Sequence, residues 1–314
     1  MRFAAGWESR MSPGRFAALL LLALWLPSCG ERAEETPGGK VRVVAAIPPV
    51  AYFVERIGDG HVQVDVLVAP GQNPHIYEPT PRQAAGLAAA QVYFKVGMPF
   101  ERVLAERIAE TSPKLRIVDV CAGITLRTMA ESEADHDGDE KPDGHGHESG
   151  ALDPHAWLNP RYAKLMAATI ERALAELDAA HAAEYEKNLQ ALQADLDAAD
   201  ARLRRVFAPL KGKELMVFHP AFGYLADAYG LRQVSVEIEG KEPSARQLGA
   251  LIQRAKKDGV RVIFVQPQFS RKSAEEVARE IGGAVVPLDD LAHDYLANLE
   301  AMAAKIGEAL ASEK

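Results

Sequence analysis

The chain has 314 residues, enough for one large domain or two compact ones with a substantial apolar core. Hydrophobic residues make up 48% and charged residues 25% of it, a globular composition that argues against disorder and against a membrane bundle. The formal net charge of −8 argues against a nucleic-acid partner, because such a partner favours a basic surface. An acidic balance is compatible with cation binding.

The N-terminal segment has the pattern of an export signal. Three arginines precede an apolar run from Phe16 to Leu26, which is too short to span a bilayer. The run is followed by LPSC, which resembles the lipobox of bacterial lipoproteins, where the cysteine becomes the lipidated first residue. We therefore expect residues 1–28 to be a lipoprotein signal peptide that starts at Met1 or Met11. A plain signal peptide with an incidental cysteine is the alternative.

Lipidation of Cys29 would anchor an exported, periplasmic protein to a bacterial membrane, the inner or the outer one. Residues 29–40 are polar and contain Gly and Pro, which predicts a tether between the anchor and the folded body. Cys121 is the other cysteine, so an internal disulfide is excluded once Cys29 is acylated. Its apolar neighbours predict a small buried side chain.

Short β-branched runs alternate with helical stretches in both halves of the body. This alternation predicts an α/β fold with two lobes, each a parallel four-stranded sheet flanked by helices. The predicted domains are an N-terminal lobe at 41–182 and a C-terminal lobe at 209–314. The predicted strands are 41–47, 62–68, 92–97, 115–120, 214–219, 233–238, 261–266 and 284–289, and the predicted helices between them are 81–90, 100–110, 221–229, 244–258 and 271–281.

A long helical region lies between the two halves, at roughly 160–208. Its second part has an apolar stripe at alternating four- and three-residue spacing and lacks Gly and Pro. The stripe consists of Tyr185, Leu189, Leu192, Leu196, Ala199, Leu203 and Val206. We expect one long rigid helix at 183–208 that joins the lobes, and a two-helix hairpin packed within one lobe is the alternative.

An acidic segment precedes this helical region. Residues 131–149 hold eight carboxylates against one lysine and lack apolar periodicity, so burial cannot offset the entropy of ordering them. We expect a disordered surface loop at about 126–150. Its histidines, His136, His145 and His147, are candidates for auxiliary metal capture, because His-rich tracts bind divalent ions.

Three other histidines lie in loops near strand or helix ends. His75 follows the second predicted strand, His155 lies in DPHAWLNP before a helix, and His219 ends the strand ELMVFH. Asp289 ends the strand AVVPLD in the same way. Ligands gather at the carboxyl ends of parallel strands, and three imidazoles with one carboxylate suit four-coordinate Zn²⁺. Mn²⁺ prefers more oxygen ligands.

The motifs NPHIYEPTP, DPHAWLNP, FHPAFGYLADAYGL and IEGKEPSARQL resemble those of zinc-uptake ABC-transporter solute-binding proteins, in the same order along residues 41–310. The resemblance implies two lobes joined by a long rigid helix, with the metal in the cleft between them. It makes His75, His155, His219 and an acid the ligands, with Asp289 the better match and Asp290 possible. Some zinc-binding members have glutamate immediately before the first histidine, where this chain has Pro74.

The expected function is therefore an extracytoplasmic receptor, not an enzyme, that captures Zn²⁺ and delivers it to an ABC permease, and we expect a monomer. A receptor of the same fold for manganese or iron, or an adhesin, is the alternative, although manganese-binding relatives tend to have glutamate in place of His219. A zinc hydrolase is less favoured, since the sequence lacks H-E-x-x-H and a motif that supplies a general base. His61, His181 and His293 are expected to be solvated or structural.

Overall fold

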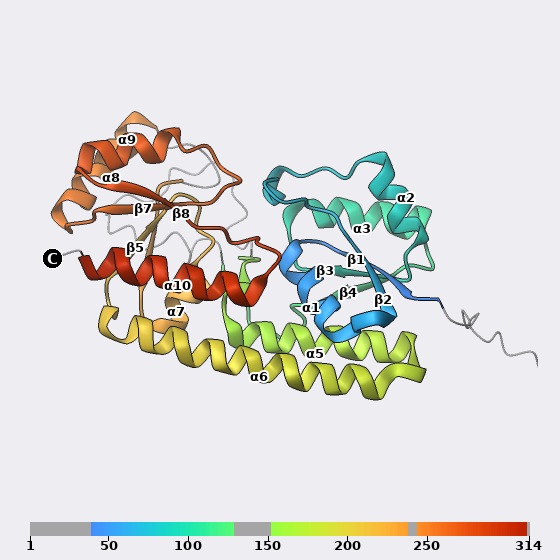
Figure 1. Ribbon diagram of the computed structural model, residues 1–314. Coiled ribbons are helices and arrows are strands. Elements are labelled where there is room, and N and C mark those ends of the chain that lie inside the picture. The colour runs from blue at the N-terminus through green and yellow to red at the C-terminus, as the bar shows by residue number, and fades with distance from the viewer. Residues whose placement is uncertain (1–38, 129–151, 238–243, 313–314) are drawn as a thin grey trace, which may run out of the picture. The chain divides into compact units, whose positions relative to one another are not determined.

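The computed structural model describes residues 39–128, 152–237 and 244–312. Residues Gly39–Lys314 form one compact unit that contains both predicted lobes. Each lobe contains a four-stranded sheet in which all the strands are parallel (Figure 1). The predicted fold class, two α/β lobes with parallel sheets, is thus confirmed.

The two sheets have the same topology. The first has the order β2-β1-β3-β4 and the second the order β6-β5-β7-β8. The strands are β1 (Val41–Ala45), β2 (Val62–Val66), β3 (Val92–Lys95), β4 (Arg116–Asp119), β5 (Glu214–Val217), β6 (Arg232–Ser235), β7 (Val262–Val265) and β8 (Ala284–Pro287). In each sheet the second strand lies on one side of the first strand, and the third and fourth lie on its other side. The crevice at such a reversal of strand order is where α/β proteins bind ligands.

Helices connect successive strands and cover the sheets. They are α1 (Pro48–Gly58), α2 (Pro81–Ala89), α3 (Pro99–Thr111), α7 (Gly223–Tyr229), α8 (Ala245–Lys257), α9 (Lys272–Ile281) and, after the last strand, α10 (Tyr295–Ser312). The sequence predicted α2, α3, α7, α8 and α9 but neither α1 nor α10. Helix α1 starts with two prolines, which the first turn tolerates because its N–H groups have no partner within the helix.

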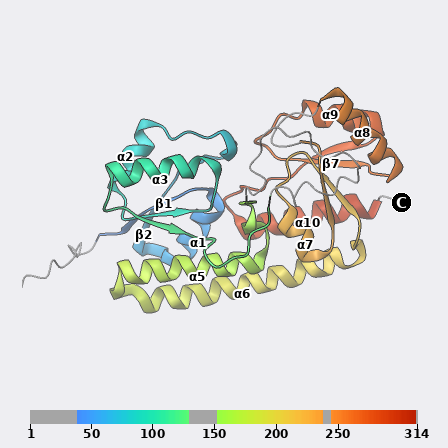
Figure 2. The same cartoon turned by 180° about the vertical axis from the view of Figure 1, so that it is seen from behind.

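The connection between the lobes is a pair of helices. Helix α5 (Pro160–Leu177) and the 26-residue α6 (Ala182–Phe207) are separated by the short turn η4 (Ala179–His181) and lie side by side (Figures 1 and 2). Helix α6 spans about 39 Å at 1.5 Å per residue. It packs against α1 of the first lobe and against α10 of the second. The predicted linking helix is therefore present, and together with α5 it forms a helical hairpin that contacts both lobes.

The buried stripe of α6 matches the predicted one except at its end. Phe207 is the last buried position, whereas Val206 is only half-buried. Buried residues of the first lobe, α5, α6 and α10 form one continuous hydrophobic cluster. That cluster also contains Leu215 and Val217 of β5, while the intervening Met216 faces a second cluster beneath α8 and α9. A core shared by both lobes and by α6 opposes large movements of one lobe against the other.

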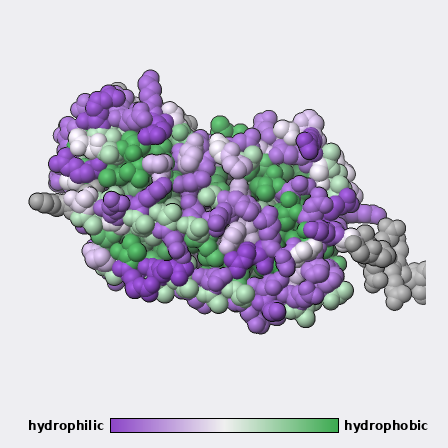
Figure 3. Space-filling model, in the orientation of Figure 1, coloured by the Kyte–Doolittle hydropathy of each residue, from purple (hydrophilic) through white to green (hydrophobic). Residues whose placement is uncertain are grey.

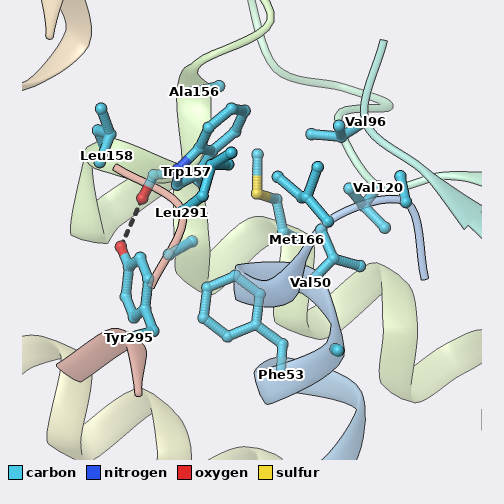
Figure 4. Packing of buried hydrophobic residues seen from close by; sticks show 14 of the residues in the cluster. Val50, Phe53, Val96, Val120, Ala156, Trp157, Leu158, Met166, Leu291 and Tyr295 are labelled. Carbon is cyan, nitrogen blue, oxygen red and sulfur yellow. Dashed lines mark hydrogen bonds between the residues drawn. The ribbon is translucent and has the colours of Figure 1, made fainter. Parts of the chain in front are cut away.

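The octapeptide DPHAWLNP forms a rigid turn before α5. Asn159 caps the helix by accepting a hydrogen bond from the Arg161 backbone N–H, with Pro160 in the first turn. Trp157 is fully buried, and its indole Nε1 donates to the carbonyl oxygen of Asp290 at 2.8 Å. The Tyr295 hydroxyl donates to the carbonyl oxygen of Trp157 (Figure 4). These bonds hold the segment around His155 against the start of α10.

The face shown in Figure 3 is mostly hydrophilic, with small hydrophobic patches between polar side chains. Within residues 39–128, 152–237 and 244–312, each helix is too short or too polar to cross a bilayer.

Candidate metal centre

The three histidines predicted as metal ligands lie together. One ring nitrogen from each of His75, His155 and His219 lies within 4.8 Å of the other two. Nε2 of His155 is 3.3 Å from Nε2 of His75 and 3.4 Å from Nε2 of His219. Three side chains separated by 80 and 64 positions along the chain therefore present the same ring atom to one point.

His75 comes from the first lobe. It lies in the short turn η2 (Pro74–Ile76), which begins after β2, and its backbone N–H donates to the side-chain oxygen of Asn73 at 2.8 Å. Pro74, the residue directly before His75, has its own backbone torsion φ fixed by its ring. The cap and the proline together position the His75 ring, which is partly exposed, whereas the next side chain, Ile76, projects into solvent.

His155 lies between Pro154 and the turn η3 (Ala156–Leu158), and it is fully buried. The carboxylate oxygen Oδ1 of Asp153, also fully buried, accepts from the backbone N–H of His155 at 3.0 Å and from its Nδ1 at 2.7 Å. This pair of bonds fixes both the turn and the orientation of the ring, and it leaves Nε2 without the ring proton.

His219 comes from the second lobe, immediately beyond β5 and next to the end of β7. The Gln266 side chain donates to the His219 carbonyl at 3.0 Å, which ties the two strand ends together at the point where the strand order reverses. Nδ1 of His219 lies 2.5 Å from Oε2 of Glu237, and its ring stacks on Phe269 with centroids 4.6 Å apart. Its side chain is almost completely buried.

The two buried carboxylates determine the tautomers of their histidines. When Asp153 and Glu237 are ionised they only accept hydrogen bonds, so in the neutral rings of His155 and His219 the Nδ1 atoms carry the protons and the Nε2 atoms carry lone pairs. The Nε2 atoms of His155 and His219 are 3.4 Å apart, so their lone pairs repel each other. A cation bound by both nitrogens replaces this repulsion with attraction. Histidine ligands whose other ring N–H donates to a carboxylate are typical of zinc sites.

Burial also favours the neutral forms of His75 and His219. It is the main cause that lowers the pKa of His219 well below its ordinary value of 6.5, and the neighbouring His155 acts in the same direction. Burial, followed by His219 and His155, lowers the pKa of His75 in the same way. Burial raises the pKa of Glu237 to about 7, against the opposing effect of His155. Neutral imidazoles are the form that binds a metal ion, so the group is prepared for a cation.

The acidic pair at the end of β8 lies near this group but outside the set of three. Asp289, the predicted fourth ligand, is partly exposed, and its Oδ1 accepts from the Gln268 side chain at 3.1 Å and from the Leu291 backbone N–H at 2.9 Å. Asp290 is buried, its Oδ1 lacks a hydrogen-bond partner among the described residues, and His155 lies close enough to lower its pKa. Burial outweighs this effect and raises the pKa of Asp290 to about 6.

Several predicted residues fall outside the described part of the chain. They are Cys29, His136, His145 and His147. Cys121 is buried as expected: its thiol donates to the Val96 carbonyl, and burial, with Asp119 next, raises its pKa to about 12. The sequence analysis did not identify Asp153 and Glu237 as partners of the histidines. Asp153 stands two positions before His155, a spacing that allows this turn, but Glu237 offered no such signal.

Comparison with known proteins agrees with this geometry. The family described as zinc-uptake complex component A, periplasmic, matches residues 43–309. The chain belongs to this family. Because its members are solute-binding receptors that act outside the cytoplasm with ABC permease and ATPase partners, the prediction that the chain is not an enzyme is confirmed.

Individual relatives cover most of the chain. The high-affinity zinc uptake system protein ZnuA of Bacillus subtilis (strain 168) is 31% identical over 277 residues, which cover 88% of this chain and 86% of that protein. The iron-binding protein YfeA of Yersinia pestis is 30% identical over 292 residues, 88% of each chain. A solved crystal structure of ZnuA has a TM-score of 0.78 and 38% identity, and the match covers 86% of this chain and 99% of that one.

Proposed function

We propose that this chain is an extracytoplasmic receptor that captures Zn²⁺ and delivers it to an ABC permease. The observation that carries the proposal is the convergence of three Nε2 atoms, two of them on rings whose Nδ1 atoms are held by buried carboxylates. In this proposal Zn²⁺ is the transported ligand and not a resident cofactor. The ligands come from both lobes and from the turn before α5, so one ion joins the two halves of the molecule.

Zinc is favoured over manganese or iron by the donor set. Imidazole nitrogen suits Zn²⁺, whereas Mn²⁺ is bound better by oxygen ligands, and here three of the donors are nitrogen. One relative carries the name of an iron-binding protein, so iron is the second candidate. Zinc outcompetes both metals at many nitrogen sites in vitro, which makes growth a better discriminator than affinity alone.

The fourth ligand is proposed to come from the acidic pair at 289–290. The sequence pattern favours Asp289. However, Oδ1 of Asp289 already accepts hydrogen bonds from Gln268 and from Leu291. The buried, unpartnered Oδ1 of Asp290 supports Asp290 instead, because a buried carboxylate oxygen without a partner is costly unless a cation or a donor reaches it. A comparison of the two asparagine variants separates these possibilities.

Capture of the ion requires no covalent step. The neutral imidazoles and the carboxylate lose water as they bind the ion, and protons compete with it as the pH falls. The apolar core shared by the lobes and α6 limits hinge closure, so release proceeds through small tilts of the lobes or rearrangement of the ligand loops when the permease engages. Small-angle scattering that detected a large compaction on zinc binding would contradict this mechanism.

We also propose that the receptor is a monomer anchored to a bacterial membrane through a lipid on Cys29. The proposal rests on the LPSC sequence that follows the apolar run. Metabolic labelling with an alkyne fatty acid tests it: the wild-type chain should be labelled, and Cys29→Ser should abolish the label. Equal labelling of both would contradict it. The histidines at 136, 145 and 147, which lie outside the described residues, are proposed to collect zinc at low affinity.

Two experiments test the proposed function. Titration of the metal-free chain with Zn²⁺ should show a tight equivalent that is lost in His155→Ala and retained in His293→Ala, a histidine outside the centre. Growth of a strain that lacks the gene should fail under zinc chelation and should be restored by added zinc but not by manganese or iron. Restoration by iron alone would favour the second candidate.

A further inference from the structure

A second group of metal-binding side chains lies apart from the three-histidine centre. His61 ends the turn η1 (Asp59–His61) that follows α1, His181 ends η4 between α5 and α6, and Glu184 lies in the first turn of α6. One potential ligand atom from each lies within 4.8 Å of those of the other two. The sequence analysis expected both histidines to be solvated or structural, and about 120 positions separate them in the chain.

The contacts in this group resemble those of the main centre. Nε2 of His61 is 3.0 Å from Oε2 of Glu184. Nδ1 of His181 is 2.7 Å from Oδ2 of Asp178, an oxygen that also accepts from the Tyr185 hydroxyl at 2.7 Å. With its Nδ1 proton donated to Asp178, His181 presents its Nε2 lone pair as a ligand, as His155 and His219 do through their own carboxylates.

The group is accessible to ions from solvent. The side chains of His61, His181 and Glu184 are 29%, 36% and 61% exposed. The two imidazole rings stack, with centroids 3.7 Å apart and planes inclined by 23°. An ion bound to Nε2 of an imidazole lies near the plane of that ring, so binding by both rings requires them to tilt apart. Their partial exposure leaves room for that movement.

We propose that His61, His181 and Glu184 form a second binding site for a divalent transition-metal ion such as Zn²⁺. Two imidazoles and one carboxylate are a donor set that suits Zn²⁺, Cu²⁺ and Ni²⁺, and water completes the coordination on the solvent side. The site shares no residue with the three-histidine centre, and the proposal holds whether or not that centre binds zinc. Because its ligands are more exposed and must reorient, it binds more weakly than the main centre.

The position of this site gives it a mechanical consequence. Its ligands belong to two separate parts of the fold, the connection from α1 to β2 and the turn between α5 and α6. An ion bound by all three crosslinks the first lobe to the linking helices. Since it binds the folded chain and not the separated segments, it raises the melting temperature in proportion to the logarithm of the ion concentration above its Kd.

The test is a Zn²⁺ titration of the full chain by calorimetry, with His136, His145 and His147 all changed to asparagine so that weak binding cannot arise from them. This background should bind two equivalents, one tight and one weak. Adding His61→Asn or His181→Asn should remove the weak equivalent and retain the tight one, which also reports that the variant is folded. Adding His293→Asn is the matched control: His293 pairs with Glu55 at 2.9 Å, and neither residue belongs to the group.

Two further variants sharpen the result. Asp178→Asn should weaken the second equivalent by about 10- to 100-fold, the usual effect of losing the outer partner of a histidine ligand. His155→Ala should remove the tight equivalent and leave the weak one. A single equivalent in the background chain that His61→Asn and His181→Asn leave unchanged would overturn the proposal. So would a weak equivalent that persists in His61→Asn and His181→Asn, or one that disappears with His155→Ala.

Discussion

Nδ1 of His219 lies 2.5 Å from Oε2 of Glu237, a carboxylate that is itself only 7% exposed. Glu237 therefore sets which ring nitrogen of His219 faces the proposed ion. Glu237→Gln keeps the shape of the side chain and removes its charge, so the affinity for Zn²⁺ should fall by about 10- to 100-fold. Competition with a fluorescent chelator measures this change. Glu55→Gln, in an exposed pair with His293, is the control, and equal affinities of the two variants would count against the role of Glu237.

The fourth ligand gives a second prediction. Asp290→Asn should weaken Zn²⁺ binding by more than the roughly 10- to 100-fold cost of losing an outer partner, because it removes a ligand atom. Asp289→Asn should have a smaller effect, since an amide oxygen can still accept the bonds from Gln268 and from the Leu291 backbone. The same chelator competition decides between them. The reverse order of the two effects would identify Asp289 as the ligand, as the sequence pattern predicted.

The stability of the metal-free chain should depend on pH through His219. Its pKa in the folded chain lies well below 6.5, so below pH 6.5 the unfolded chain binds a proton at this position that the folded chain does not. The contribution of His219 to stability is therefore retained above pH 6.5 and decreases as the pH falls, by up to about 1.4 kcal/mol per pH unit, whereas Glu237, with its pKa raised to about 7, contributes in the opposite direction. Urea unfolding between pH 7 and 5 should show a shallower decline for His219→Asn, and parallel declines would refute the explanation.

The shared core predicts that α6 stabilises the whole unit. Leu196→Ala removes a fully buried side chain from the middle of the helix and should lower the free energy of unfolding by about 2–5 kcal/mol in a single transition. Lys187→Ala, at an exposed position of the same helix, should have little effect. Denaturant melts monitored by tryptophan fluorescence and by circular dichroism provide the comparison. Separate transitions for the two probes would show that the lobes unfold independently.

Much of this fold could be predicted because its signals are local. Most of the eight strands are short runs rich in β-branched residues, and the stripe of α6 repeats with helical spacing over many turns. Helix α1 was missed because its paired prolines suggest a break, although both fit in a first turn. Helix α10 was not predicted, because it follows the last strand and therefore lies outside the alternation of strands and helices.

The centre was predictable only in part. The histidines 75, 155 and 219 each stand in a stiff, proline-marked or strand-end setting, and from that pattern the sequence predicted that all three would lie together. Their carboxylate partners were not predicted, because the hydrogen bond of His219 to Glu237 depends on how β5 and β6 pair in the second sheet. The pairing of His61 with His181 likewise depends on the packing of α1 against α5 and α6, which no local pattern specifies.

The most direct test of the central claim is a crystal structure of the zinc-loaded chain with anomalous diffraction measured at the zinc edge. The account predicts one strong peak at about 2.0–2.1 Å from the Nε2 atoms of His75, His155 and His219, with a carboxylate oxygen of the 289–290 pair as the fourth ligand. A strong peak that lies elsewhere, or one coordinated through Nδ1 of His155 or His219, would contradict it.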